Sequence, residues 1–194
     1  LASGCWPFIK QRPYDIIANP NVKPKAIFVS AYSTAPLAAD YDFTLMGKEK
    51  ELQAAVTAMS KLTDGVVNVG VGKNSKSVFE SLEDITVHKI SGKHPAGNVG
   101  TLINKLNPVN KGEVVWTISP QDLVIIGELL LTGKFNAERV VALSGSSVKD
   151  PKYYTTKIGS EVSTILYTSG LNEEHVRIID GNVLSGNKIT PTGH

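Results

Sequence analysis

Cysteine is almost absent from this sequence, since Cys5 is the only one among 194 residues. A single thiol cannot form an intrachain disulfide, and it excludes zinc sites and iron–sulfur clusters built from the cysteines of one chain. Long apolar runs are also missing. The longest, residues 123–131, contains Gly127 and Glu128 and falls far short of the roughly 20 apolar residues that span a membrane. We therefore expect no transmembrane segment in this chain.

An excess of charge of either sign is absent as well. The 20 lysines and arginines are nearly balanced by 18 acidic residues, which gives a net charge of +2. Proteins that bind nucleic acids usually concentrate basic residues on one face, whereas here they are spread along the chain, so we expect no nucleic-acid partner. A hydrophobic content of 41% is typical of a globular protein with one substantial core or two small ones.

The chain starts with leucine, and its first 24 residues contain no signal-peptide pattern. This segment is interrupted by prolines and carries Trp6, Phe8 and Tyr14, aromatic residues that normally pack against other parts of a protein. We predict that residues 1–24 are an irregular lead-in from a missing N-terminal module, and that the chain is an excised piece of a longer protein.

Between residues 25 and 145, strand-like apolar runs alternate with segments of helical periodicity. Strands are expected at 25–31, 66–71, 85–90, 113–118 and 139–143, and helices at 42–62, 77–82, 99–106 and 120–131. Ser119 and Pro120 form a typical helix start, and Gly133 a typical helix end. Alternation with short connections indicates parallel crossovers. Residues 25–145 therefore predict one α/β domain with a doubly wound, mainly parallel sheet.

The pattern changes after residue 145. Strands are expected at 152–157 and 176–180, with a short helix at 160–167 between them. This combination predicts a small β-grasp-like α+β module over residues 146–194. The sequence ends without a recognisable last element, so a truncated module is one interpretation.

The most informative stretch is the loop at residues 91–101, between the strand expected at 85–90 and the helix expected at 99–106. It contains Gly92, His94, Pro95, Gly97 and Gly100. Loops after the carboxyl ends of parallel strands commonly hold ligands, and a helix N-terminus offers free N–H groups to an anion. However, the glycine spacing matches neither the dinucleotide fingerprint nor a P-loop. A phosphate cradle is only weakly indicated.

The candidate site combines this loop with the one that follows the first strand, residues 30–40. We take as ligand-binding candidates Thr34, Asp40, His94, Pro95, Gly97, Gly100 and Thr101. A histidine such as His94 can act as an acid or a base, as a donor to a ligand or as a metal ligand, but it can equally be a loop histidine that bonds a backbone carbonyl. We assign no catalytic residue and no metal ligand. Residues 143–148 do not match Gly-x-Ser-x-Gly, and the histidines show no paired-ligand spacing.

Many short segments of the chain resemble the A subunit of the bacterial sodium-translocating NADH:quinone oxidoreductase. The segments that carry the resemblance are Arg12-Pro13, Ile27 to Val29, Thr34 to Asp40, Gly92 to Thr101, Leu106 to Val109, Val115 to Ile118, Gln121-Asp122, Gly127, Thr132-Gly133 and Arg139 to Leu143. Residues 145–188 look like the soluble-ligand-binding β-grasp module of that subunit. The resemblance thus extends over most of the chain.

The resemblance implies a Rossmann-like fold similar to the flavin-binding subunit of complex I, although the glycine-rich flavin loop of that relative is not reproduced here. It also implies a peripheral subunit on the cytoplasmic side of the bacterial inner membrane, in a respiratory complex that couples NADH oxidation and quinone reduction to sodium export. The other subunits of the complex are then its partners. NADH, flavins and an iron–sulfur centre are expected in those subunits, and no cofactor is expected in this fragment.

Two local roles remain open. In the first, the loops at 30–40 and 92–101 line a site for quinone or another small ligand. In the second, the fragment is a non-catalytic scaffold that docks on the membrane subunits, and it has no ligand site. In either case the fragment alone is not expected to be catalytic.

Overall fold

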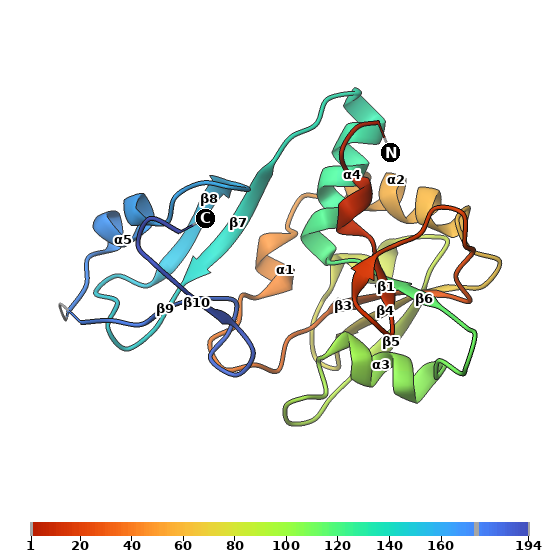
Figure 1. The fold of residues 1–194 in the computed structure, drawn as a ribbon, viewed down its shortest axis with the longest axis horizontal. Helices are drawn as coiled ribbons and strands as arrows, with labels where there is room; N and C mark the ends of the chain where they lie inside the picture. The colour runs from red at the N-terminus through yellow and green to blue at the C-terminus, as the bar shows by residue number, and fades with distance from the viewer. Residues whose placement is uncertain (1, 173–174, 194) are drawn as a thin grey trace. The chain divides into compact units, whose positions relative to one another are not determined.

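The computed structural model describes residues 2–172 and 175–193, and it divides into two compact units. The first unit comprises the residues up to Thr34 together with Asp40–Asn136. The second comprises Ala35–Ala39 and the residues from Ala137 onward. Figure 1 shows the elements of each unit.

The first unit is built on a sheet that has six strands within the described residues, in the order β2-β1-β6-β3-β4-β5. The strands are β1 Lys10–Arg12, β2 Ile16–Ile17, β3 Ile27–Ala31, β4 Val67–Gly72, β5 Thr86–Ile90 and β6 Val115–Thr117. Strands β3 to β6 run parallel, while β1 is antiparallel to both β6 and β2. The chain moves outward from β3 to β5 and then returns to β6 on the other side of β3. The winding direction therefore reverses between β3 and β6, which is where α/β sheets commonly form a ligand crevice.

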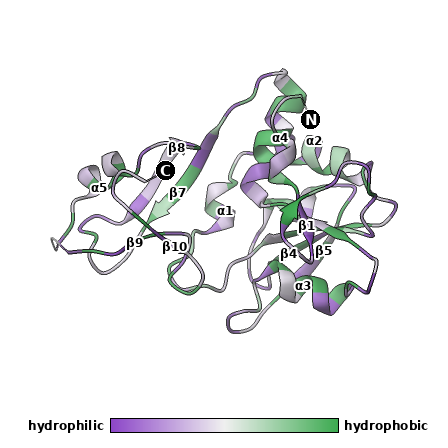
Figure 2. Ribbon diagram, in the orientation of Figure 1, coloured by the Kyte–Doolittle hydropathy of each residue, from purple (hydrophilic) through white to green (hydrophobic). Residues whose placement is uncertain are grey.

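Helices cover both faces of this sheet. Helices α2 (Glu49–Ser60) and α4 (Pro120–Thr132) pack on the face that carries Ile27 and Val29, and α3 (Val99–Leu106) packs on the face that carries Phe28. Successive strand residues point to opposite faces, which explains why neighbours in β3 join different core clusters. Figure 1 shows α3 on the opposite side of the sheet from α2 and α4, and Figure 2 shows apolar residues along most of α4.

Local sequence signals explain where these helices begin and end. The Ser119 hydroxyl accepts a hydrogen bond from the Asp122 N–H at the start of α4, and Gly133 ends that helix in the left-handed region at φ 71°. The helix expected at 42–62 is split into α1 (Tyr41–Thr44) and α2, because Gly47 has a φ of 75°. The segment expected as a helix at 77–82 forms the 3-10 turn η2, Val78–Ser81.

Within its described residues, the second unit contains two small antiparallel pairs of strands. Strand β7 (Glu138–Leu143) pairs with β8 (Lys152–Lys157), and β9 (Ile178–Asp180) pairs with β10 (Asn187–Ile189). Helix α5, Ser163–Ser169, lies between the two pairs in sequence. The expected strands and helix of this region are thus present, and β10 was not expected.

The sheet partner expected for residues 139–143 is wrong. The strand expected at 139–143 is not the fifth strand of the parallel sheet, because β7 pairs antiparallel with β8. The eight residues between them are too few for a parallel crossover, which needs a dozen or more. The second unit accordingly begins at Ala137, nine residues before the boundary expected after residue 145.

Residues 1–24 were expected to be irregular, but they contribute to the first unit. Strand β1 pairs with β6, and the 3-10 turn η1 (Trp6–Phe8) precedes it. The Trp6 indole N–H donates to the Ala18 carbonyl at 2.7 Å, and its ring meets Trp116 edge to face with centroids 5.5 Å apart. Trp6 and Phe8 therefore pack against the core of their own chain, whereas Tyr14 is 80% exposed. No helix in the described part of the chain is both long enough and apolar enough to cross a bilayer.

Candidate functional site

The loops that follow β3 and β5 meet at the carboxyl edge of the parallel strands. Parallel strands end at the same edge of a sheet, so the residues after Ala31 and after Ile90 emerge close together. Hydrogen bonds between the two loops join Ser30 and Thr34 to His94 and Gly97. The structure thus brings together Thr34, His94 and Gly97 of the candidate set.

Gly97 is seated against the loop after β3. Its N–H donates to Thr34 Oγ1 at 3.0 Å, and its carbonyl accepts from Ser30 Oγ at 2.7 Å. A Cβ atom at Gly97 would lie 2.6 Å from the Tyr32 carbonyl oxygen and 2.8 Å from the Thr34 nitrogen. Only glycine permits this backbone approach, and it does so without a left-handed φ, because Gly97 is not among the residues with positive φ.

His94 is half-buried beside Thr34, with its Nδ1 3.3 Å from Thr34 Oγ1. Thr34 Oγ1 accepts the Gly97 N–H and keeps its own hydrogen, which we assign to a hydrogen bond with His94 Nδ1. In this arrangement Nδ1 is the acceptor and Nε2 carries the imidazole hydrogen. His94 therefore bonds a side-chain hydroxyl, and not the backbone carbonyl that loop histidines often bond.

The remaining candidates serve local structure. The Pro95 carbonyl accepts from the Asn98 N–H at 2.9 Å and from the Thr101 hydroxyl at 3.0 Å, which stabilises the entry to α3. Gly100 lies exposed in the first turn of α3, and a Cβ atom there would meet nothing within 4 Å. Asp40 caps α1 by accepting from the Asp42 N–H at 2.9 Å.

Asp42 has an unusual environment within the loop region after β3. Its carboxyl is half-buried, and burial raises the pKa of Asp42 above its ordinary value. The Asp40 carboxylate raises this pKa further, and the backbone N–H of Lys76 only partly compensates. The residues described here include no group of three or more His, Cys, Asp or Glu side chains suited to hold a metal ion.

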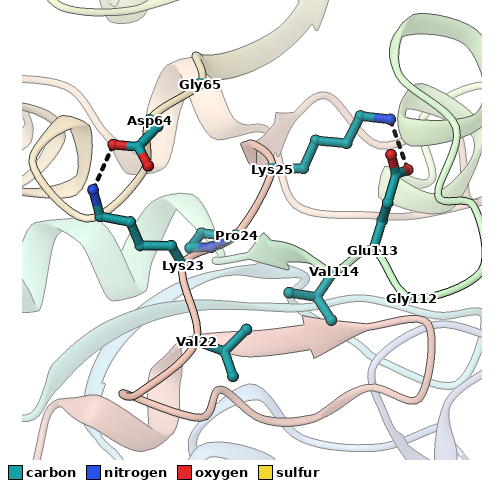
Figure 3. Close-up of a pocket in the computed structure, with 9 residues that line it drawn as sticks. All are labelled: Val22, Lys23, Pro24, Lys25, Asp64, Gly65, Gly112, Glu113 and Val114. Carbon is teal, nitrogen blue, oxygen red and sulfur yellow. Dashed lines mark hydrogen bonds and ion pairs between the residues drawn. The ribbon is translucent and has the colours of Figure 1, made fainter.

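An open hollow at the opposite, amino edge of the sheet was missed by sequence reasoning. It has a volume of about 420 Å³ and is lined by Val22, Lys23, Pro24, Lys25, Asp64, Gly65, Gly112, Glu113 and Val114. Figure 3 shows two ion pairs across it, Lys23 with Asp64 and Lys25 with Glu113, the second at 2.8 Å. The sequence did contain a signal for this hollow. Turn residues and charged residues precede β3, β4 and β6, and the amino ends of these parallel strands share one edge of the sheet.

The charges of this hollow neutralise one another. Lys25 Nζ also donates to the Pro108 carbonyl at 3.1 Å, and its bond to Glu113 lowers the pKa of that carboxyl. Asn110 donates to the same carboxylate through its backbone N–H at 3.0 Å and its side chain at 3.1 Å. Because both partners of this pair are satisfied, the hollow offers no free charge from Lys25 or Glu113. A structural role in joining the strand ends explains these contacts.

Comparison with known proteins gives matches over both units. Residues 1–135 match the family model described as the NqrA second alpha/beta domain, and residues 140–190 match that of the NQRA C-terminal domain. The Na(+)-translocating NADH-quinone reductase A subunit of Klebsiella pneumoniae is 38% identical over 188 residues, which are 97% of this chain and 42% of that protein.

Two further relatives carry the same name. The A subunit of a Marinomonas species is 38% identical over 186 residues, which are 96% of this chain and 41% of that protein. The A subunit of Neisseria meningitidis serogroup B is 37% identical over an alignment of 195 positions, which covers 100% of this chain and 43% of that protein. The chain thus spans about two fifths of the length of these relatives.

Proposed function

The chain belongs to the family of Na(+)-translocating NADH-quinone reductase A subunits, and we propose that it forms part of such a subunit in a membrane respiratory complex. In this proposal the subunit is peripheral and lies on the cytoplasmic side of the bacterial inner membrane. The complex couples NADH oxidation and quinone reduction to sodium export. One observation carries the proposal: the similarity extends through both units of the chain. Only four residues separate the two matched regions.

The proposed fold assignments are a Rossmann-like domain for the first unit and a β-grasp-like module for the second. The reversal of winding between β3 and β6 supports the first. The proposed partners are the other subunits of the complex. NADH, flavins and an iron–sulfur centre are assigned to those subunits in this proposal, and none of them to this chain.

Within the complex, the geometry supports a scaffold role for the loop at residues 91–101. A phosphate or carboxylate site at a helix N-terminus needs N–H groups that point at the ligand. Gly97 lies just before Asn98, the N-cap of α3; its N–H is bonded to Thr34 and its carbonyl to Ser30. The loop therefore uses these polar groups to join two strand ends, as a rigid docking surface requires.

A second candidate role is a small-ligand site, and one observation favours it. If His94 Nδ1 accepts from Thr34, its Nε2–H is oriented by the protein and can donate to a carbonyl oxygen such as that of a quinone. The two roles make different predictions for variants of this pair, which can be compared in the assembled complex.

The test uses the Klebsiella pneumoniae protein with its aligned segment replaced by residues 1–194, expressed with the other subunits of its complex. In the scaffold role, His94→Ala and Thr34→Val lower the thermal stability of this chimera and leave the KM for quinone unchanged. In the ligand role, His94→Ala raises that KM several-fold, while Thr101→Val, which removes a local bond only, does not. A chimera that folds but fails to copurify with the other subunits would contradict complex membership.

A further inference from the structure

The edge strand β2 exposes apolar side chains at the end of the six-stranded sheet. Ile16 and Ile17 are 52% and 51% exposed, and Tyr14, just before the strand, is 80% exposed. Strand residues alternate between the two faces of a sheet, so Ile16 and Ile17 present apolar surface on both faces. Isolated exposed hydrophobic residues are ordinary, but three within four positions at a sheet edge form a patch. We name Tyr14, Ile16 and Ile17 the β2 edge.

The backbone of β2 also has unpaired groups that point away from the sheet. The Ala18 N–H donates to the Ile9 carbonyl at 2.9 Å, so Ala18 faces β1. Pairing partners in antiparallel strands alternate between hydrogen-bonded and non-hydrogen-bonded pairs. In the register Lys10↔Ile17 and Gln11↔Ile16, the backbone N–H and C=O of Ile16 therefore point toward β1. The backbone N–H and C=O of Ile17 point away from β1, outside the sheet. Another strand can bond to these two groups.

The opposite edge of the same sheet provides an internal comparison. Strand β5 exposes Thr86 and Lys89, and Lys89 forms an ion pair with Glu80 at 2.7 Å. Polar and charged residues, above all lysine, are how soluble proteins keep edge strands from pairing. At the β2 edge the strand itself carries no charged residue, and the nearby Arg12 and Asp15 lie outside β2 and pair with each other at 3.3 Å. The β5 edge therefore has the polar residues expected of a solvent-exposed edge strand, and the β2 edge lacks them.

We propose that the β2 edge is covered in the full-length protein by an extended apolar segment of the same polypeptide, lying outside these 194 residues, which pairs with Ile17 as an additional strand. A strand supplies the N–H and C=O that Ile17 needs, and apolar residues on both of its faces match those of Ile16 and Ile17. Relatives at 37–38% identity are more than twice as long as this chain, so they have the length to supply it. The proposal rests on family membership and does not depend on the complex being active.

Hydrogen exchange in the chimera described above tests this proposal. Exchange is read at single residues for the Ile17 and Lys89 amides, in the purified chimera and in the assembled complex. By the same alternation the Lys89 N–H points outward at the β5 edge, since the Ile90 carbonyl bonds the Lys73 N–H after β4. An Ile17 amide that exchanges at least about tenfold more slowly than Lys89 in the purified chimera supports the proposal. Equal exchange in both samples, or protection that arises only in the complex, overturns it.

A labelling experiment checks the side chains independently. Ile17→Cys and Lys89→Cys are placed separately in a chimera whose other accessible cysteines have been removed, while the buried Cys5 is kept. In the purified chimera we expect slow maleimide labelling at position 17 and fast labelling at position 89. Equally fast labelling at both positions overturns the proposal. Either outcome leaves the proposed function standing, because that is tested by assembly and activity.

Discussion

At the scale of single residues, the glycine–histidine loop depends on close contact between two backbones. Gly97 lies where a side chain would meet the Tyr32 carbonyl oxygen and the Thr34 nitrogen, both of which belong to the backbone and cannot rotate away. The Thr34 hydroxyl then links Gly97 to His94. One threonine thus connects the loop after β3 with the loop after β5.

We expect Gly97→Ala to destabilise the protein by about 1–3 kcal/mol, because the new Cβ forces the two loops apart. Gly100→Ala is the matched control, since Gly100 has open space around it and a helical conformation. Its stability should be unchanged or raised by up to about 1 kcal/mol. Denaturant unfolding of both variants measures the difference. Equal stabilities would show that the loops are not in contact.

Asp42 gives a prediction for pH. Its pKa in the folded protein is raised, so below its ordinary value of 3.8 it is protonated in both folded and unfolded states, and no difference arises. As the pH rises above 3.8, the unfolded state loses its proton first, and stability falls until the folded-state pKa is passed. Asp42→Asn should therefore raise the melting temperature at pH 7 and leave it unchanged near pH 3. A variant that is less stable at pH 7 would contradict this.

The sequence indicated which loops lie close together at the candidate site, while ligand binding by these residues stays a prediction. Thr34, His94 and Gly97 belong to loops after two parallel strands, and that pattern alone indicates a shared edge. The roles of Gly100 and Asp40 could not be read in the same way. A glycine needed for close approach and one lying in open space look the same in a sequence, because the difference lies in the partner backbone.

At the scale of elements, the crossing of α2 and α4 sets the packing on one face of the sheet. A Cβ atom at Gly127 of α4 would lie 1.8 Å from the Glu51 carbonyl oxygen of α2. Since both Gly127 and the facing turn of α2 are helical backbone, neither can yield without moving a whole helix. The glycine that interrupts the apolar run of residues 123–131 is therefore a packing requirement.

We expect Gly127→Ala to cost about 3 kcal/mol of stability, because the two helices must separate. Gly100→Ala again serves as a control for a helical glycine without a neighbour. Thermal melts of the two variants give the comparison. If Gly127→Ala melts at the wild-type temperature, α2 and α4 do not cross at this position.

Element types were easier to predict than strand partners. Ser119 and Gly133 allowed both ends of α4 to be predicted, because helix ends are determined by nearby residues. The partner of β7 could not be read from its apolar run, since that run looks the same in a parallel sheet and in a hairpin. Strands β1 and β2 escaped prediction because they are two or three residues long and lie beside prolines.

At the scale of the whole molecule, two units joined in one chain match two consecutive family domains. The family could be predicted from the sequence more completely than the strand pairing, because many short segments spread over the chain agree with one family. The second unit begins nine residues before the boundary expected after residue 145, because the strand expected at 139–143 pairs within the second unit.

We propose above that this chain forms part of a sodium-translocating NADH:quinone oxidoreductase. The most direct measurement is NADH-driven quinone reduction, with and without sodium, in membranes whose complex contains the chimera. Membranes in which the aligned segment is deleted set the baseline. We predict that residues 1–194 restore sodium-stimulated quinone reduction above that baseline. A chimera that assembles into the complex but shows no sodium-stimulated activity would contradict the proposed function.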